Sequence, residues 1–473
     1  MDYHSLADLQ AALRDGSINL RAVVNHYLTK IESSKHLNVF LDVYKEESLN
    51  RADQLQQKLA TQQPLGQLFG LVIGIKDVLV YKDRPVRAGS KILDGFHSQF
   101  TATAVQRLID EDAIIIGMQN CDEFAMGSSN ENSAYGPTLN AADTSKVPGG
   151  SSGASAVSVQ AGLCMAALGT DTGGSVRQPA AFCGVVGLKP TYSRISRHGL
   201  IAYASSFDCI GIFSNNIEDN ARILAVIAGK DEYDSTVSLK DVPAYHEQLN
   251  TDKKYKVAYF DECLNNEALQ PEIKSVMDEQ LAKIKKAGHT VEKADFSLFD
   301  YLLPTYYILT TAEASANLSR FDGVRYGYRA PKAEKLEEMY KLSRSEGFGE
   351  EVKRRIMTGT FVLSASYYDA YYTKAQKLRR MIQEESRKIL AAYDFIILPT
   401  TPTTAFPLNS QTEDPAEMYL ADIFTVQANV SGIPAISLPL GKDNNNMPIG
   451  VQLMSDVFKE EDLYAFSDQL MRL

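Results

Sequence analysis

Cysteine is scarce in this sequence, and the few cysteines present do not form an obvious pairing pattern. There are five of them, an odd number with no CxxC spacing, and most sit among apolar or small residues. This usage is typical of reduced, buried thiols and indicates a reducing compartment. Long hydrophobic runs are also missing, since none approaches the roughly 20 residues of a membrane-spanning helix. The first residues carry no basic-then-apolar leader. We therefore expect a soluble, cytoplasmic protein.

Positive charge is in deficit as well. The chain has 48 Lys and Arg against 59 Asp and Glu, a net charge of −11. An acidic balance argues against a broad nucleic-acid or anionic-membrane surface made by this chain alone. In other respects the composition is ordinary, with 44% hydrophobic and 23% charged residues, which excludes a disordered, collagen-like or coiled-coil protein. The 473 residues suggest two or three domains, but no repeat or long linker divides them, and large α/β enzymes can form one unit of this size.

Short apolar runs alternate with helical patterns along the chain, which predicts an α/β fold. The runs at 68–75, 113–117 and 395–399 are typical of strands buried on both faces. Two further runs, at 436–440 and 449–453, flank a polar turn and predict a hairpin. The predicted helices include 5–31, broken into a pair at 15–16, and 45–60, 101–112, 154–163 and 271–287.

Two loops rich in glycine and serine, at 148–155 and 169–175, carry the candidate chemistry. Ser151 and Ser175 are 24 residues apart, a separation that fits a loop, a short helix, an apolar segment and a second loop. Both serines can then reach one edge of a sheet. Glycines before Ser175 let backbone N–H groups converge on one point, as an oxyanion requires, and a helix starting near Pro179 would add its positive end. Flexible loops with capping serines are the alternative.

The segment 149–153 also matches the GxSxG pattern of a nucleophile elbow. That motif needs a preceding strand, but residues 140–148 are a polar loop. None of the seven histidines stands in a local context that suits a partner base. A Ser-His-Asp triad is therefore a poor explanation of these loops.

A neutral lysine can also act as the base that activates a serine. Lys76 ends an apolar strand, where burial would lower its pKa and free a lone pair for proton abstraction. The alternative is a lysine that extends to the surface and pairs with Asp77 at the strand end.

Several segments together resemble the amidase signature family over essentially the whole chain. They are GIKDVLV, VPGGSSGAS, GTDTGGSVRQPAAFCGVVGLKPTYSRISRHGLIAYASSFD and EASANLSRFDGVRYGY, of which the part at 149–190 is highly specific. SRSEGFGEEVKRRIMTGTFVLSASYYDAYY and PTTPTTAF are similar to the glutamine-hydrolysing subunits of tRNA-dependent amidotransferases within that family. The resemblance implies one domain over 1–473, in which a central mixed β-sheet is covered by helices on both faces. Its expected parts are N-terminal helices at 1–65, a catalytic core at 66–230 and a mainly helical substrate-pocket region at 290–390.

The resemblance also implies a Ser-Ser-Lys triad. Ser175 is the expected acyl-forming nucleophile, Ser151 the relay serine that follows a cis peptide bond, and Lys76 the terminal base. The proton of Ser175 would pass through Ser151 to Lys76, and the reverse relay would protonate the leaving ammonia. The expected oxyanion hole consists of the backbone N–H groups of Thr172, Gly173, Gly174 and Ser175.

A glutamine pocket is implied in the same way. Arg355 is expected to bind the α-carboxylate of glutamine with its two-pronged guanidinium, and Asp422 to bind the α-ammonium. Tyr306 is the expected pocket tyrosine, with Tyr307 as the alternative, and Ser128 is expected to line the pocket. Without the resemblance, Arg355 is interpreted as a helix-surface charge and Asp422 as an acid on a helix face.

The implied activity is hydrolysis of glutamine to glutamate and ammonia. In the family, a partner B subunit uses the ammonia and ATP to convert Glu-tRNA(Gln) to Gln-tRNA(Gln), and a small C subunit tethers the pair in a heterotrimer. This chain has no P-loop pattern and no clustered His or Cys ligands, so we expect no cofactor or metal in it, and ATP, magnesium and most tRNA contacts on the partner. The alternatives are a stand-alone amidase acting on another carboxamide and a catalytically silent assembly subunit. Three residues depart from the family's pattern: Ala154, Cys209 and Ile212.

Overall fold

The computed structural model describes residues 5–249, 251–410 and 415–473 of the chain. The strands are β1 Phe40–Val43, β2 Val72–Lys76, β3 Ile114–Gln119, β4 Ala166–Asp171, β5 Val186–Lys189, β6 Cys209–Ser214, β7 Lys256–Tyr259, β8 Thr290–Lys293, β9 Phe395–Pro399, β10 Ala435–Lys442 and β11 Pro448–Ser455. The helices are α1 Leu6–Arg14, α2 Leu20–Ser33, α3 Lys45–Ala60, α4 Thr103–Asp110, α5 Gly153–Gln160, α6 Arg177–Cys183, α7 Ile217–Ile227, α8 Asp261–Leu264, α9 Pro271–Lys286, α10 Phe299–Asn317, α11 Leu336–Gly347, α12 Glu350–Val362, α13 Lys374–Ala392, α14 Pro415–Leu420, α15 Val426–Ser431 and α16 Glu460–Met471.

All of these strands join one mixed sheet of eleven strands, in the order β1-β3-β2-β4-β6-β5-β10-β11-β9-β7-β8. The strand β2 is parallel to both of its neighbours, β3 and β4, and β7 is parallel to β8 and β9. The remaining pairs, including β4 with β6 and β10 with β11, are antiparallel. The observed sheet confirms the predicted α/β class.

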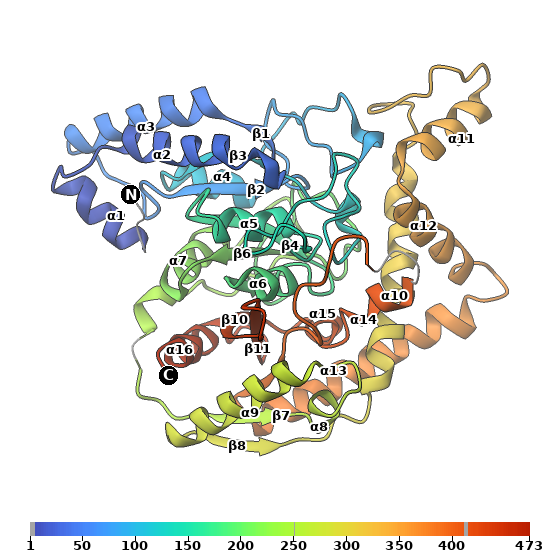
Figure 1. The fold of residues 1–473 in the computed structure, drawn as a ribbon. Coiled ribbons are helices and arrows are strands. Elements are labelled where there is room, and N and C mark those ends of the chain that lie inside the picture. The colour runs from blue at the N-terminus through green and yellow to red at the C-terminus, as the bar shows by residue number, and fades with distance from the viewer. Residues whose placement is uncertain (1–4, 250, 411–414) are drawn as a thin grey trace.

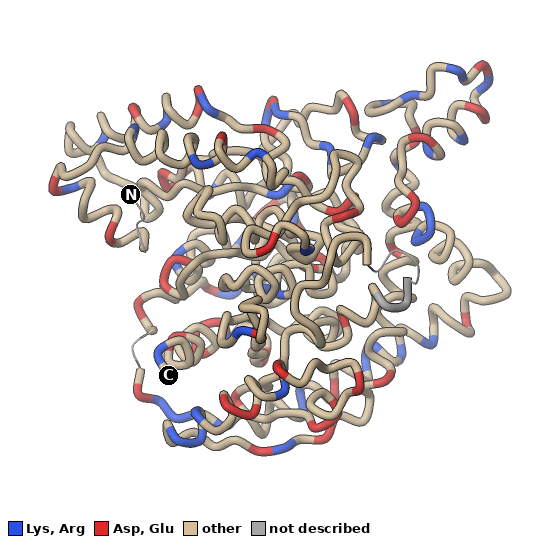
Figure 2. Tube along the Cα trace, viewed as in Figure 1, with Lys and Arg blue, Asp and Glu red and all other residues tan. Residues whose placement is uncertain are grey.

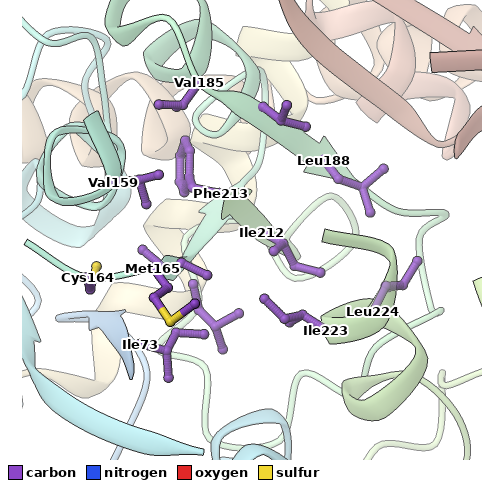
Figure 3. Packing of buried hydrophobic residues seen from close by; sticks show 14 of the residues in the cluster. Ile73, Val159, Cys164, Met165, Val185, Leu188, Ile212, Phe213, Ile223 and Leu224 are labelled. Carbon is purple, nitrogen blue, oxygen red and sulfur yellow. The ribbon is translucent and has the colours of Figure 1, made fainter. Parts of the chain in front are cut away.

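Helices cover both faces of this sheet. Every residue of β2, β3, β4 and β6 is buried, although successive side chains of a strand point to opposite faces. Figure 3 shows how this arises at β6, where Phe213 lies beside Val159 of α5 and Ile212 lies beside Ile223 and Leu224 of α7. These contacts belong to the larger of two extended buried clusters, and they hold the centre of the sheet rigidly in place.

Most predicted elements are confirmed, with shifted ends. The helix pair is broken around residues 15–16 into α1 and α2, the helix at 45–60 is α3, and the predicted hairpin is β10–β11. The apolar run at 68–75 becomes a strand only from Val72, because residues 68–71 form a turn before it. The N-terminal region also contributes β1 to the sheet edge, a strand that its helical pattern did not predict.

The peripheral helices lie on two opposite sides of the molecule. In Figure 1, α10, α11 and α12 lie together at the side of the molecule opposite α1 and α2. Figure 2 shows acidic and basic residues interspersed along the outer helices.

The five cysteines are all free and buried. Within the described ranges, no helix is both long and apolar enough to cross a membrane.

Candidate active site

The two predicted serine loops meet beside Lys76. Lys76 is the last residue of β2, and the parallel strand β4 next to it leads into the loop that carries Ser175. Parallel neighbours end at the same sheet edge, where α/β proteins commonly place their sites. The loop that contains Ser151 arrives at this edge just before α5, and the backbone N–H of Ser152 donates to the carbonyl of Ser175 over 3.2 Å. The expected convergence of the two loops is thus observed.

Lys76 is fully buried among hydroxyl groups. Its Nζ lies 2.7 Å from Oγ of Ser151 and 2.9 Å from both Oγ of Ser152 and Oγ1 of Thr170. Burial lowers the pKa of Lys76 to about 8, although nearby carboxylates favour the charged form. The alternative pairing with Asp77 is wrong, because that buried carboxylate accepts two backbone N–H groups instead. Lys76 is therefore placed to exchange a proton with a serine hydroxyl.

The peptide bond between Gly150 and Ser151 is cis, as the resemblance implied. The loop is held by Asp122, whose backbone N–H donates to the carbonyl of Ser151 over 3.2 Å. A Cβ at Gly150 would collide with the Asp122 carboxylate, so only glycine fits there. Ser152 is a further residue that sequence reasoning missed: its hydroxyl donates to the carbonyl of Thr170 and accepts from the Thr170 N–H. It ties this loop to the end of β4.

The loop before Ser175 presents backbone donors. Gly174 has a φ of +133°, and a side chain there would collide with Thr425. Its N–H donates to the Asp171 carboxylate over 2.9 Å, so this one of the four expected oxyanion donors is already bonded. Among the described residues, the structure records no hydrogen bond from the N–H groups of Thr172, Gly173 or Ser175. These three remain the candidate oxyanion hole.

A buried ion pair between Asp171 and Arg177 stabilises the loop that carries Ser175. The guanidinium of Arg177 donates to both carboxylate oxygens of Asp171, over 3.0 and 3.1 Å, and both side chains are fully buried. Burial works against the charge of Asp171, but Arg177 outweighs it and lowers the pKa to about 2. Arg177 also donates to the carbonyl of Thr425, over 2.8 Å. Sequence reasoning missed this frame, although Asp171 and Arg177 flank the predicted nucleophile at 175.

Arg355 is the residue expected to bind the α-carboxylate of glutamine. It is 3% exposed on α12, so the interpretation as a helix-surface charge is wrong. Its Nε donates to Glu351 over 2.8 Å and its Nη1 donates to the hydroxyl of Tyr203 over 2.9 Å. The guanidinium carbon also lies 5.5–5.6 Å from the ring centroids of Tyr203, Tyr307 and Tyr419. These three aromatic rings stabilise the charge of Arg355 through cation–π interactions.

Asp422 lies in the turn between α14 and α15 rather than on a helix face. It is 8% exposed and accepts a hydrogen bond from the hydroxyl of Tyr307 over 2.8 Å. Burial raises its pKa to about 7. The neighbouring Tyr306 packs against Gly173 of the second loop instead. Tyr306 thus contacts the nucleophile loop, and Tyr307 makes the polar contact with Asp422.

Asp422 and the nucleophile loop are directly joined through Thr425. The hydroxyl of Thr425 donates to the carbonyl of Gly173 over 2.6 Å and contacts the carbonyl of Asp422 at 3.0 Å. On the other side, Asp208 accepts a hydrogen bond from the hydroxyl of Thr172 over 2.7 Å, and burial raises its pKa to about 7. Thr425 and Asp208 are positioning residues that sequence reasoning missed: Thr425 lies far from the signature segment, and Asp208 is its last residue, to which no role was given.

Ser128 and the three departures from the family's pattern are the remaining predicted residues. Ser128 is buried, but no recorded contact joins it to Arg355 or Asp422, so its role stays a prediction. Of the departures from the family's pattern, Cys209 lies opposite Asp171 in the β4–β6 pair and Ile212 lies opposite Leu168. Ala154 is the second residue of α5. All three leave the Lys76–Ser151 contact intact.

Comparison with known proteins identifies the family of this chain. A family model described as Amidase matches residues 22–464. The A subunit of the glutamyl-tRNA(Gln) amidotransferase of Chlorobium luteolum is 49% identical over 475 residues, which cover 100% of this chain and 98% of that protein. The crystal structure of the subunit of the same name from Thermotoga maritima has 37% identity and a TM-score of 0.77, and the match covers 95% of this chain and 90% of that one. A peptide amidase from Stenotrophomonas maltophilia has 25% identity and a TM-score of 0.83, and the match covers 99% of this chain and 96% of that one. This chain belongs to the amidase family and, within it, groups with the glutamyl-tRNA(Gln) amidotransferase A subunits.

Proposed function

We propose that this chain hydrolyses the side-chain amide of glutamine to glutamate and ammonia through Lys76, Ser151 and Ser175. The observation that carries the proposal is the fully buried Lys76 amine, 2.7 Å from the hydroxyl of Ser151 and beside the loop of Ser175. A lysine of lowered pKa in such a place serves as a base. The family membership is consistent with amide hydrolysis.

The proposed reaction is a proton relay followed by acyl transfer. Ser175 Oγ attacks the amide carbon while its proton passes to Ser151 and the proton of Ser151 passes to neutral Lys76. The N–H groups of Thr172, Gly173 and Ser175 stabilise the negative oxygen of the tetrahedral intermediate. The relay then runs backward to protonate the leaving ammonia. Water hydrolyses the acyl-enzyme by the same route and frees glutamate.

Arg355 and Asp422 select a free amino acid as the substrate. The two side chains carry opposite charges and contact the same tyrosine, Tyr307, which places them at neighbouring points of the pocket. The α-carboxylate of glutamine pairs with Arg355 and its α-ammonium pairs with Asp422. An uncharged carboxamide would gain nothing from these two groups.

The ammonia is used by a partner in this proposal. The similar proteins are named as subunits of an amidotransferase for Glu-tRNA(Gln), and this sequence has no P-loop pattern of its own. The partner B subunit would therefore bind ATP and magnesium and convert Glu-tRNA(Gln) to Gln-tRNA(Gln), and a C subunit would tether the two in a cytoplasmic heterotrimer. Most tRNA contacts would lie on the B subunit, in keeping with the net charge of −11 here.

Co-purification with the B and C subunits, combined with an ammonia assay, tests the proposal. The wild-type complex should release ammonia from glutamine, and Ser175→Ala should abolish the release while the complex still assembles. Activity that survives in the Ser175→Ala complex would refute the nucleophile. Hydrolysis of simple amides in preference to glutamine would favour the stand-alone amidase instead.

A further inference from the structure

The two charged groups of the pocket are close enough to attract each other. The guanidinium carbon of Arg355 lies 5.5 Å from the ring centroid of Tyr307, whose hydroxyl donates to Asp422 over 2.8 Å. Attraction between opposite charges is strong in a buried site, where little water screens it. Even so, none of the salt bridges among the described residues joins Arg355 to Asp422. Each charge is held by a different group.

Glu351 is the group that holds Arg355. It lies one turn earlier on α12 and is 5% exposed. Its Oε1 accepts from Nε of Arg355 over 2.8 Å and from the hydroxyl of Tyr419 over 3.2 Å, and its Oε2 accepts from Arg354. A glutamate four residues before an arginine on one helix is the favourable orientation for such a pair. Three donors thus hold the carboxylate on a rigid element.

This arrangement leaves N–H groups on Nη1 and Nη2 of Arg355 available. An arginine has five N–H groups, of which Nε–H is bonded to Glu351 and one on Nη1 is bonded to Tyr203. The other three have no recorded partner among the described residues. Two parallel N–H groups on one edge of a guanidinium match the two oxygens of a carboxylate. The anchored arginine therefore keeps donors free for a substrate.

We propose that Glu351 is a positioning residue that keeps Arg355 from pairing with Asp422 before substrate binds, so that both charges stay available to an α-amino acid. This inference rests on the proposed function. Without Glu351, the buried Arg355 would take Asp422 as the nearest counter-charge, and a substrate would have to break that pair before it could use either group. Amides that carry a carboxylate, an ammonium or both would then bind less well, whereas an uncharged amide would be unaffected.

Glu351→Gln in the full complex tests the inference with four amides. Glutamine carries both charges, glutaramate only the carboxylate, 4-aminobutanamide only the ammonium, and butanamide neither. KM, or the inhibition constant where hydrolysis is slow, should rise about tenfold for glutamine with kcat within about twofold, as expected for lost binding without lost chemistry. The constants for both singly charged amides should also rise, and those for butanamide should not.

The matched control is Glu350→Gln, which changes the neighbouring glutamate on the same helix. Glu350 is 86% exposed and pairs with Lys353 at the surface, so this variant should behave like the wild type. An equal loss on butanamide would show a merely structural role for Glu351, and a loss confined to amides with a carboxylate would show that it only orients Arg355. Either result, or an unchanged KM for glutamine, would overturn the inference. A wild-type complex that does not prefer glutamine to butanamide would instead refute the proposed function itself.

Discussion

The pH dependence of hydrolysis should differ between glutamine and butanamide, because only glutamine needs the charge of Asp422. Lys76 must be neutral to accept a proton, and its pKa of about 8 leaves it about half neutral at pH 8 and about 1% neutral at pH 6. The value of kcat/KM for butanamide should therefore fall about fiftyfold between these two pH values. Asp422 must be ionised to bind an ammonium, and its pKa of about 7 leaves it about 90% ionised at pH 8 and about 10% at pH 6. For glutamine, the fall should be about ten times larger, roughly five-hundredfold.

The assay is ammonia release at low substrate concentration, followed from pH 6 to pH 9 for both amides. On logarithmic axes, the slope below pH 7 should approach one for butanamide and two for glutamine, because one and two groups titrate there. Asp422→Asn provides the control, since it should weaken glutamine hydrolysis at pH 8 and make the two profiles parallel. Parallel profiles in the wild type would refute the assignment of Asp422 to the ammonium. A rate for butanamide that stays constant down to pH 6 would refute Lys76 as the base.

Three further substitutions test the frame around the site. Arg177→Met should lower the free energy of unfolding by about 3–5 kcal/mol in urea titrations, because it leaves the buried Asp171 without its counter-charge; a loss below about 1 kcal/mol would contradict this. Gly173→Ala should lower kcat on both amides by about a hundredfold, because the new methyl group collides with Tyr306 and displaces an oxyanion donor. Equal kcat values in the variant and the wild type would show that the oxyanion hole lies elsewhere. Lys76→Met should remove the activity at every pH up to 9, and activity that returns at high pH would point to another base.

Local patterns in the sequence were sufficient for most of the fold. The apolar runs identified the buried strands, and a turn with three asparagines at 444–446 identified the β10–β11 hairpin. The strand β1 was missed, because its four residues follow helices and form a strand only by pairing with β3. Such an edge strand is stabilised by its partner and not by its own sequence pattern.

The sequence by itself also predicted the triad, because Lys76, Ser151 and Ser175 lie in short segments rich in glycine and serine that resemble the amidase signature. Only the tertiary structure decided the surroundings of Arg355 and Asp422, the two residues proposed to bind the substrate. Arg355 and Asp422 come from segments far apart in the chain, and their sequence surroundings are those of ordinary surface charges. Burial, which arises when α10, α12 and the turn before α15 pack together, excludes water from these groups. The exclusion of water raises the pKa of Asp422 and strengthens the ion pair between Arg355 and Glu351. No local sequence pattern predicts this burial.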